Sequence, residues 1–288
     1  MTGFVEVVSP GLYSSIQDLG RFGARKYGVP VSGAMDGQGA ALANHLLNNA
    51  PGAALLEITM MGPKLFFTAP TQIAIAGADI SPQLDGLPLA LNKVHSVGTG
   101  ALLSFGALRL GLRCYLAVKG GFQTEKVMGS RSYFAPVTRA SALGKGDKLP
   151  FTVYNRQENL FTTVGINPSH FSASGLPCTR GPEFDWLSPG ERDLVFNTAL
   201  SIGKDNNRMG YRLEGHAFQY PNGYSMLTSC VLPGTVQLTP SGGLIVLMKD
   251  CQTTGGYPRV LQLSPEGINR LAQKKAADIV TFDRPAKG

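Results

Sequence analysis

The sequence predicts a mainly β protein with a few short helices, and three observations lead to this fold class. Short apolar runs recur along the chain, and turn residues separate them. The chain contains 36 glycines and 19 prolines, which favour tight turns between strands over long helices. Hydrophobic residues make up 43% of the 288 residues and charged residues 16%, so the chain can bury a sizeable core. The pattern is typical of a β-barrel or β-sandwich.

The apolar runs are the predicted strands. Many are rich in Val, Ile and Leu, and Gly, Pro, Asp or Ser residues bound them. In chain order they are FVEVV, LEITM, KLFF, QIAIAG, PLAL, ALLSFG, CYLAVKGG, TVQLT, LIVLM and RVLQL.

Helices are expected where a capping residue precedes an amphipathic run. The expected helices are 37–49 after the cap Asp36, 189–200 after Ser188, and 265–275 after Ser264. The polar stretch 155–175 has no hydrophobic period, which favours a domain boundary there. We therefore expect an N-terminal β-rich domain over 1–165 and a C-terminal domain over 166–288.

Composition argues against several classes of protein. The net charge is +7, but the basic residues are scattered, so no nucleic-acid footprint is expected. No run of about 18 apolar residues offers a membrane span, and the N-terminus has no signal-peptide pattern. The four cysteines and four histidines lack the spacing of metal or redox motifs, so no metal is predicted. These features favour a cytoplasmic protein.

The N-terminal segment 15–36 is dense in glycines and polar residues. Gln17, Asp18 and Arg21 can present an amide, an acid and a guanidinium from one loop. The alternative is a loop that its own hydrogen bonds hold in place. Arg131, in GSRS, is a second candidate for anion binding or for tying two loops together.

Further arginines lie in the second half of the chain, at Arg180, Arg208 and Arg212. Arg208 and Arg212 are four residues apart, so they share one side of either a helix or an extended strand. Two such cations can converge on a carboxylate or phosphate. A salt-bridged surface pair is the alternative.

The stretch KDCQTTGGYPRV follows a predicted buried strand. If the strand continues, Asp250 and Gln252 point to the same face. Gly255 and Gly256 can form a turn whose amides face inward and bind an anion or a carbonyl oxygen. An acid, an amide, hydroxyl groups and free backbone N–H groups together suit a site for a small amide or carboxylate. The alternative is a plain turn held by local hydrogen bonds.

Taken together, these motifs resemble the biotin-dependent carboxyltransferase family. Members include the C subunit of 5-oxoprolinase, the allophanate-hydrolase-subunit-2-like part of urea carboxylase, and the bacterial antagonist of a histidine-kinase inhibitor. The motifs that carry the resemblance, in order, are SIQDLGRFG, GVPVSGAMD, LEITMMGPKLFF, IAIAGAD, YLAVKGGF, GSRS, GKGDKL, NRMGYRLEG, PGTVQL and DCQTTGGYPRV.

The resemblance implies two β-rich domains, of which the second is a cyclophilin-like β-barrel. It implies a subunit of an ATP-dependent 5-oxoprolinase-type amidohydrolase, which converts 5-oxoproline to glutamate. The implied partners are a subunit-1-like protein, which is the B-type component of 5-oxoprolinase, and a separate barrel-type protein, which is its A-type component. ATP is used by the complex. Two alternatives stay open: a regulatory protein that sequesters the subunit-1-like partner, and the carboxyltransferase module of a urea-carboxylase-type enzyme.

The resemblance also implies a set of substrate-binding residues, and the loops that carry them are expected to converge on one pocket. Three departures from the family pattern stand out. Tyr133 stands where the family usually has Thr. Ser229 and Cys230 replace its acid and glycine, and SGGL replaces its DGQP turn; these last two changes motivate the regulatory alternative. The residues that match family motifs are Gln17, Asp18, Arg21, Asp36, Asn44, Arg131, Arg180, Asn207, Arg208, Arg212, Gln237, Asp250, Gln252, Thr253, Gly255, Gly256 and Tyr257.

Overall fold

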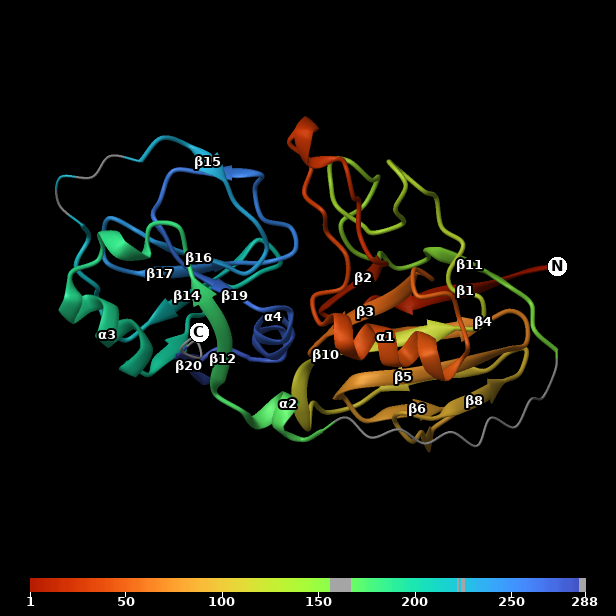
Figure 1. Ribbon diagram of the computed structural model, residues 1–288. Coiled ribbons are helices and arrows are strands. Elements are labelled where there is room, and N and C mark those ends of the chain that lie inside the picture. The colour runs from red at the N-terminus through yellow and green to blue at the C-terminus, as the bar shows by residue number, and fades with distance from the viewer. Residues whose placement is uncertain (156–166, 222, 224–225, 285–288) are drawn as a thin grey trace. The chain divides into compact units, whose positions relative to one another are not determined.

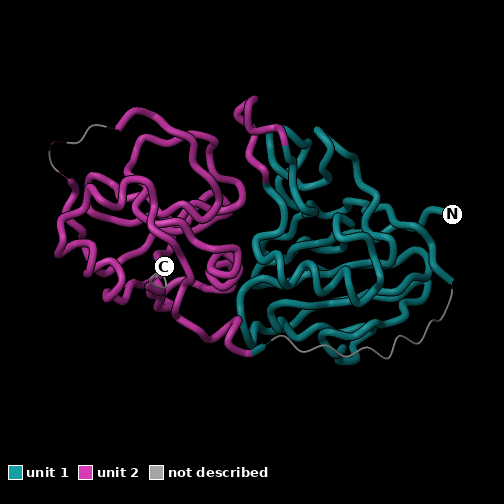
Figure 2. Tube along the Cα trace, viewed as in Figure 1, with its two compact units in different colours: residues 1–22, 32–167 teal, residues 23–31, 168–288 magenta. Residues whose placement is uncertain are grey.

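The computed structural model describes residues 1–155, 167–221, 223 and 226–284. Two compact units make up the chain (Figures 1 and 2). Unit 1 comprises Met1–Phe22 and Ser32–Asn167, and unit 2 comprises Gly23–Val31 and Pro168–Gly288. The boundary predicted at 165/166 lies outside the described residues, and the assignment of Gly23–Val31 to unit 2 has no counterpart in the sequence prediction.

Unit 1 is built from two antiparallel sheets and one helix. The first sheet has the order β11-β1-β4-β9-β6-β7, and the second has the order β2-β3-β10-β5-β8. The strands of unit 1 are β1 (Thr2–Ser9), β2 (Tyr13–Gln17), β3 (Leu55–Thr59), β4 (Lys64–Phe67), β5 (Thr71–Asp79), β6 (Pro82–Leu84), β7 (Leu87–Pro88), β8 (Val94–Val97), β9 (Leu102–Phe105), β10 (Leu110–Val118) and β11 (Lys148–Thr152).

The main core of unit 1 lies between these two sheets. Val5 and Phe67 of the first sheet belong to the same buried cluster as Ile58 and Leu116 of the second. A second cluster lies under helix α1 (Gly37–Leu46), on the other face of the second sheet. Strand β10 is therefore covered on both faces, which explains its nearly continuous apolar sequence.

Unit 2 contains a closed barrel of seven strands, in the order β12-β19-β16-β17-β14-β13-β20. Neighbouring strands are antiparallel except for β12 and β20, which are parallel. The barrel strands are β12 (Gly175–Arg180), β13 (Leu200–Ile202), β14 (Gly210–Glu214), β16 (Thr235–Leu238), β17 (Leu244–Leu247), β19 (Arg259–Leu263) and β20 (Ile279–Asp283). The barrel confirms the mainly β fold class.

Short elements complete the described part of unit 2. The helices α3 and α4 begin after Ser188 and Ser264, whose hydroxyl groups accept hydrogen bonds from the backbone of Glu191 and Gly267. Both caps agree with the sequence prediction, as does Asp36 before α1. The remaining elements are α2 (Ser169–Ser172), α3 (Pro189–Asn197), α4 (Pro265–Ala272), the 3₁₀ turns η1 (Arg25–Tyr27) and η2 (Phe184–Trp186), and the two-stranded sheet β15 (Ser229–Cys230) and β18 (Thr254–Gly255).

Among the described residues, none of the helices has the length and apolar character that a membrane span requires. Within that same part of the chain, no cluster of three or more His, Cys, Asp or Glu side chains is arranged to hold a metal ion.

Candidate functional site

Asp18 joins the N-terminal signature loop to the GSRS loop. Its carboxylate accepts hydrogen bonds from the backbone N–H of Gly20 at 2.8 Å and of Arg131 at 2.7 Å. It also accepts from the hydroxyl groups of Ser130 at 2.6 Å and Ser132 at 2.7 Å. Four donors occupy the two oxygens, which leaves little capacity to bind a ligand or move a proton. For Asp18, the geometry favours the role of fixing the loops.

Arg21 and Gln17 lie beneath the surface of the same loop, and both are fully buried. The guanidinium of Arg21 donates to the backbone carbonyls of Ser132 and Val127. The amide of Gln17 donates to the hydroxyl of Ser15 at 3.0 Å. Arg21 thus holds the backbone of Ser132, in GSRS, and of Val127 before it, whereas Gln17 bonds within its own strand. We assign both residues a structural role.

Asp36 caps helix α1 through its carboxylate, which accepts from the backbone of Gln38 and Gly39. Its own N–H donates to the Tyr115 hydroxyl at 2.7 Å. That hydroxyl in turn donates to Glu57 at 2.9 Å. Asn44, on the same helix, donates to the carbonyl of Ala53 at 2.9 Å. Both family positions therefore help to anchor α1 and the loop that follows it.

Arg131 differs from the other signature residues of unit 1 because its side chain reaches a pocket. One of its terminal nitrogens donates to the Gln123 side chain at 2.9 Å. The pocket, which we name the cation-lined pocket, has a volume of about 650 Å³. Its lining residues are Asn48, Asn49, Ala50, Gly52, Ala53, Ala54, Lys119, Gly120, Phe122, Gln123, Lys126, Arg131, Thr152 and Tyr154.

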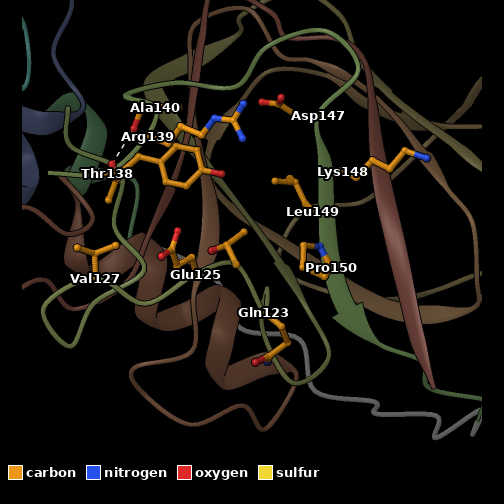
Figure 3. Close-up of a pocket in the computed structure, with 12 residues that line it drawn as sticks. Gln123, Glu125, Val127, Thr138, Arg139, Ala140, Asp147, Lys148, Leu149 and Pro150 are labelled. Atoms are coloured by element: carbon orange, nitrogen blue, oxygen red, sulfur yellow. Dashed lines mark hydrogen bonds between the residues drawn. The ribbon is translucent and has the colours of Figure 1, made fainter. Parts of the chain in front are cut away.

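A neighbouring pocket, which shares Gln123, has a volume of about 470 Å³ and a different charge pattern. Figure 3 shows cationic Arg139 and Lys148 together with acidic Glu125 and Asp147 around it. Because both signs of charge are present, this mixed-charge pocket has no clear preference for an anion.

In unit 2, Arg208 and Asp250 form a buried ion pair. The guanidinium donates to the carboxylate through two nitrogens, at 2.7 and 3.1 Å. Their side chains are 7% and 8% exposed. The expectation that Arg208 and Arg212 converge on a ligand is wrong for this geometry: β14 begins only at Gly210, Arg208 lies before it, and Arg212 is exposed on the strand.

Two expectations for the segment after β17 are also corrected. The strand ends at Leu247, so Asp250 and Gln252 do not follow strand alternation: Asp250 is buried and Gln252 is exposed. Gly255 does not form an anion-binding turn with Gly256, because it lies in β18 and pairs with Ser229. A Cβ at Gly255 would lie 2.6 Å from the terminal amide nitrogen of Gln237, so a larger residue there would have to displace that side chain.

The segment is held at several points along its backbone. Gln237 is buried on β16 and donates to the Tyr257 carbonyl at 3.3 Å. The Thr253 carbonyl accepts from the backbone of Val231 at 3.2 Å and from Arg25 at 3.0 Å. Arg25 belongs to the segment of unit 2 that lies early in the sequence (Figure 2).

The remaining predicted residues of unit 2 either bond to neighbouring backbone or are exposed to solvent. Asn207 accepts from the backbone of Met209 and Gly210, which shapes the turn before β14. Arg180 is exposed and lies over the Phe184 ring at 4.9 Å. Gln252, Gly256 and Tyr257 are also exposed. The convergence of the two groups of predicted residues, one in each unit, on a single pocket stays a prediction.

A model of the carboxyltransferase domain, subdomain A and B, matches residues 27–284 of this chain. The chain belongs to this family. Among its relatives, the C subunit of 5-oxoprolinase from Escherichia coli is 31% identical over 273 residues, which span 93% of this chain and 87% of that protein. The Haemophilus influenzae protein of the same name is 28% identical over 97% of this chain and 90% of its own length.

Larger family members match as well. Urea amidolyase from Lachancea kluyveri is 32% identical over 73% of this chain, but the match spans only 12% of that protein. The crystal structure of TTHA0988 superposes with a TM-score of 0.87 at 27% identity, covering 98% of this chain and 55% of that one. The structure of K. lactis urea amidolyase gives a TM-score of 0.86 over 97% of this chain and 18% of its own.

The sequence alone did not single out two lysines of the cation-lined pocket or one ion pair of unit 2. Lys119 and Lys126 follow β10, and neither belongs to a polar motif that would single it out. Glu183 and Arg259 form a partly buried ion pair at 2.7 Å in unit 2. Burial acts to raise the pKa of Glu183, but hydrogen bonds from Arg259 outweigh it and hold that pKa below its ordinary value.

The cysteines predict a simple pattern of thiol reactivity. Cys230 is exposed, whereas Cys114, Cys178 and Cys251 are buried. Burial raises the pKa of Cys251 to about 11 and that of Cys178 to about 12, so these thiols stay protonated and unreactive at neutral pH. We expect an aromatic disulfide reagent to react rapidly with one thiol, and with all four only after denaturation. Rapid reaction of a Cys230→Ser variant would contradict this assignment.

Proposed function

We propose that this chain is a subunit of an ATP-dependent 5-oxoprolinase-type amidohydrolase, whose overall reaction adds water across the ring amide of 5-oxoproline to give glutamate. The observation that carries the proposal is the extent of the match to the C subunit of E. coli 5-oxoprolinase. The aligned residues span 93% of this chain and 87% of that protein, so the similarity extends over most of both chains. The urea amidolyase match instead uses a small part of a much larger protein.

The geometry supports a binding and orienting role for this chain. The carboxylates of Asp18 and Asp36 accept backbone or hydroxyl hydrogen bonds, and Asp250 is paired with Arg208. None of these three acids has the open position that a general base needs. We therefore infer that these three acids position loops and do not transfer protons. The partners that we propose are a subunit-1-like protein and a barrel-type protein. Cytoplasmic location stays a prediction.

The family membership also supports a second candidate, a carboxyltransferase module of the urea-carboxylase type. That activity needs a biotin carboxylase and a biotinylated carrier in addition to this chain. The regulatory alternative would instead give a tight complex with the subunit-1-like partner and no turnover.

Reconstitution distinguishes these functions. The full-length chain is mixed with the subunit-1-like and barrel-type partners, and glutamate is measured after addition of 5-oxoproline and ATP. A parallel reaction contains urea, bicarbonate, ATP, a biotin carboxylase and a biotinylated carrier. We expect glutamate in the first reaction and no carboxylated urea in the second. Carboxylated urea without glutamate would instead support the carboxyltransferase role, and a complex inactive in both reactions would support the regulatory one.

A further inference from the structure

The cation-lined pocket of unit 1 concentrates positive charge. Lys119, Lys126 and Arg131 all line it, and none of the described residues that line it is acidic. The mixed-charge pocket next to it contains two acids and two bases. We propose that the cation-lined pocket binds a small molecule that carries an oxyanion group, through these three side chains. Arg131 is already predicted to bind an anion; the pocket gives that anion a defined place, and Lys119 and Lys126 are additional ligand-binding residues.

The three cations retain hydrogen-bond donors for such a ligand. Arg131 uses one nitrogen for Gln123, and its other guanidinium nitrogens have no partner in the described part of the chain. Lys119 donates one hydrogen bond, to the Leu47 carbonyl at 2.8 Å, out of three that an ammonium group can make. Lys126 makes no hydrogen bond or ion pair with another described residue, and it is exposed. The pocket therefore offers several unused donors and has no acid among its described lining residues.

Hydrogen bonds fix the walls of the pocket before any ligand arrives. Asn49 donates to the Val118 carbonyl and accepts from Gly120 N–H, both at 2.8 Å. Gln123 donates to the carbonyls of Gly120 and Gly121 at 2.9 and 3.1 Å. Asp18 holds the backbone of Arg131. Because these contacts order the backbone in advance, binding costs less conformational entropy than it would at a loose surface.

The size and one wall of the pocket define the class of ligand. A volume of about 650 Å³ lies in the range of small-molecule sites. The Tyr154 ring forms part of the lining, with the Lys119 ammonium 5.3 Å from its centroid, so an aromatic surface lies next to a cation. A carboxylate and a phosphate share the oxyanion chemistry that Arg and Lys recognise, and 5-oxoproline and ATP are the two sources that the proposed function would supply.

Isothermal titration of the full-length chain tests the proposal. The probes are 5-oxoproline, ATP and inorganic phosphate, each titrated separately. We expect saturable binding of at least one probe, and binding weakened by about tenfold or more in both Lys126→Gln and Arg131→Gln, because each removes a charge-assisted contact. Binding of 5-oxoproline alone identifies a carboxylate ligand, whereas binding of ATP or phosphate identifies a phosphate ligand.

Arg139→Gln is the matched control, because Arg139 is an exposed arginine of the mixed-charge pocket. It should leave binding unchanged. Absence of saturable binding for all three probes would overturn the proposal, as would equal weakening by Arg139→Gln and Arg131→Gln. Lys126 is exposed, so Lys126→Gln is expected to fold normally and keeps the test valid if Arg131→Gln is unstable. Binding is measured without the partner proteins, so this result and glutamate formation can fail independently.

Discussion

Replacing Arg208 with methionine should lower the free energy of unfolding of unit 2 by about 3–5 kcal/mol, because the substitution leaves the Asp250 carboxylate buried without its partner. The pair is bidentate and both side chains are less than one-tenth exposed, so water cannot easily replace the guanidinium. Methionine keeps much of the length and apolar volume of the arginine stem. The decrease in stability therefore reflects the lost charge and hydrogen bonds. Urea denaturation of the full-length chain measures the effect.

Arg212→Met is the matched control for this substitution. Arg212 is the same residue type four positions further on, but its side chain is exposed on β14. An exposed substitution of this kind should change stability by no more than about 0.5 kcal/mol. Equal effects of the two substitutions would contradict the assignment of Arg208 and Asp250 as a buried structural pair.

Replacing Asp18 with alanine should destabilise unit 1 by about 2–4 kcal/mol. A hydrogen bond to a charged acceptor contributes more to stability than a hydrogen bond between neutral groups. The substitution removes the common acceptor of four hydrogen bonds. The GSRS backbone would also lose the contact that fixes Arg131. We therefore expect weaker binding in the cation-lined pocket together with the loss of stability, measured by urea denaturation and by titration.

Asp85→Ala serves as the control, because Asp85 also accepts a backbone hydrogen bond, from Leu102 at 2.8 Å, but in an exposed turn. The lost hydrogen bond should cost about 1 kcal/mol or less, and alanine at the left-handed φ of 51° adds about 1 kcal/mol, so the total stays below that expected for Asp18→Ala. If Asp18→Ala abolishes activity in the reconstituted complex while stability and binding stay unchanged, Asp18 acts directly in the reaction and its structural assignment is wrong.

Local signals in the sequence predict much of the fold. The caps Asp36, Ser188 and Ser264 act within three residues of themselves, so their helices can be identified without tertiary information. The predicted run PLAL contributes only its first residue, Pro88, to the two-residue strand β7. Strands β13 and β20 escape prediction. β13 has only three residues, and the two strands pair with each other although they are far apart in the sequence. Closure of the barrel depends on such pairings, which no local pattern encodes.

The candidate site can be predicted only in part, for the same reason. The density of polar residues draws attention to Asp18 and Arg131, but the same density suits a ligand site and a hydrogen-bonded junction equally well. The structure separates these interpretations through the four donors around Asp18. Lys126 has no distinguishing motif, and the motif YLAVKGGF does not single out its Lys119 as a ligand-binding residue. Their common pocket with Arg131 depends on tertiary packing.

We propose that this chain acts within a 5-oxoprolinase-type complex and binds an anion through Arg131. The most direct test is the rate of ATP-dependent glutamate formation by the chain with both partner proteins, as a function of 5-oxoproline or ATP concentration. We predict turnover with the native chain, a loss of about tenfold or more in kcat/KM with Arg131→Gln, and no change with Arg139→Gln. Background glutamate with the native chain, from partners that are active with the C subunit of E. coli 5-oxoprolinase, would contradict this claim.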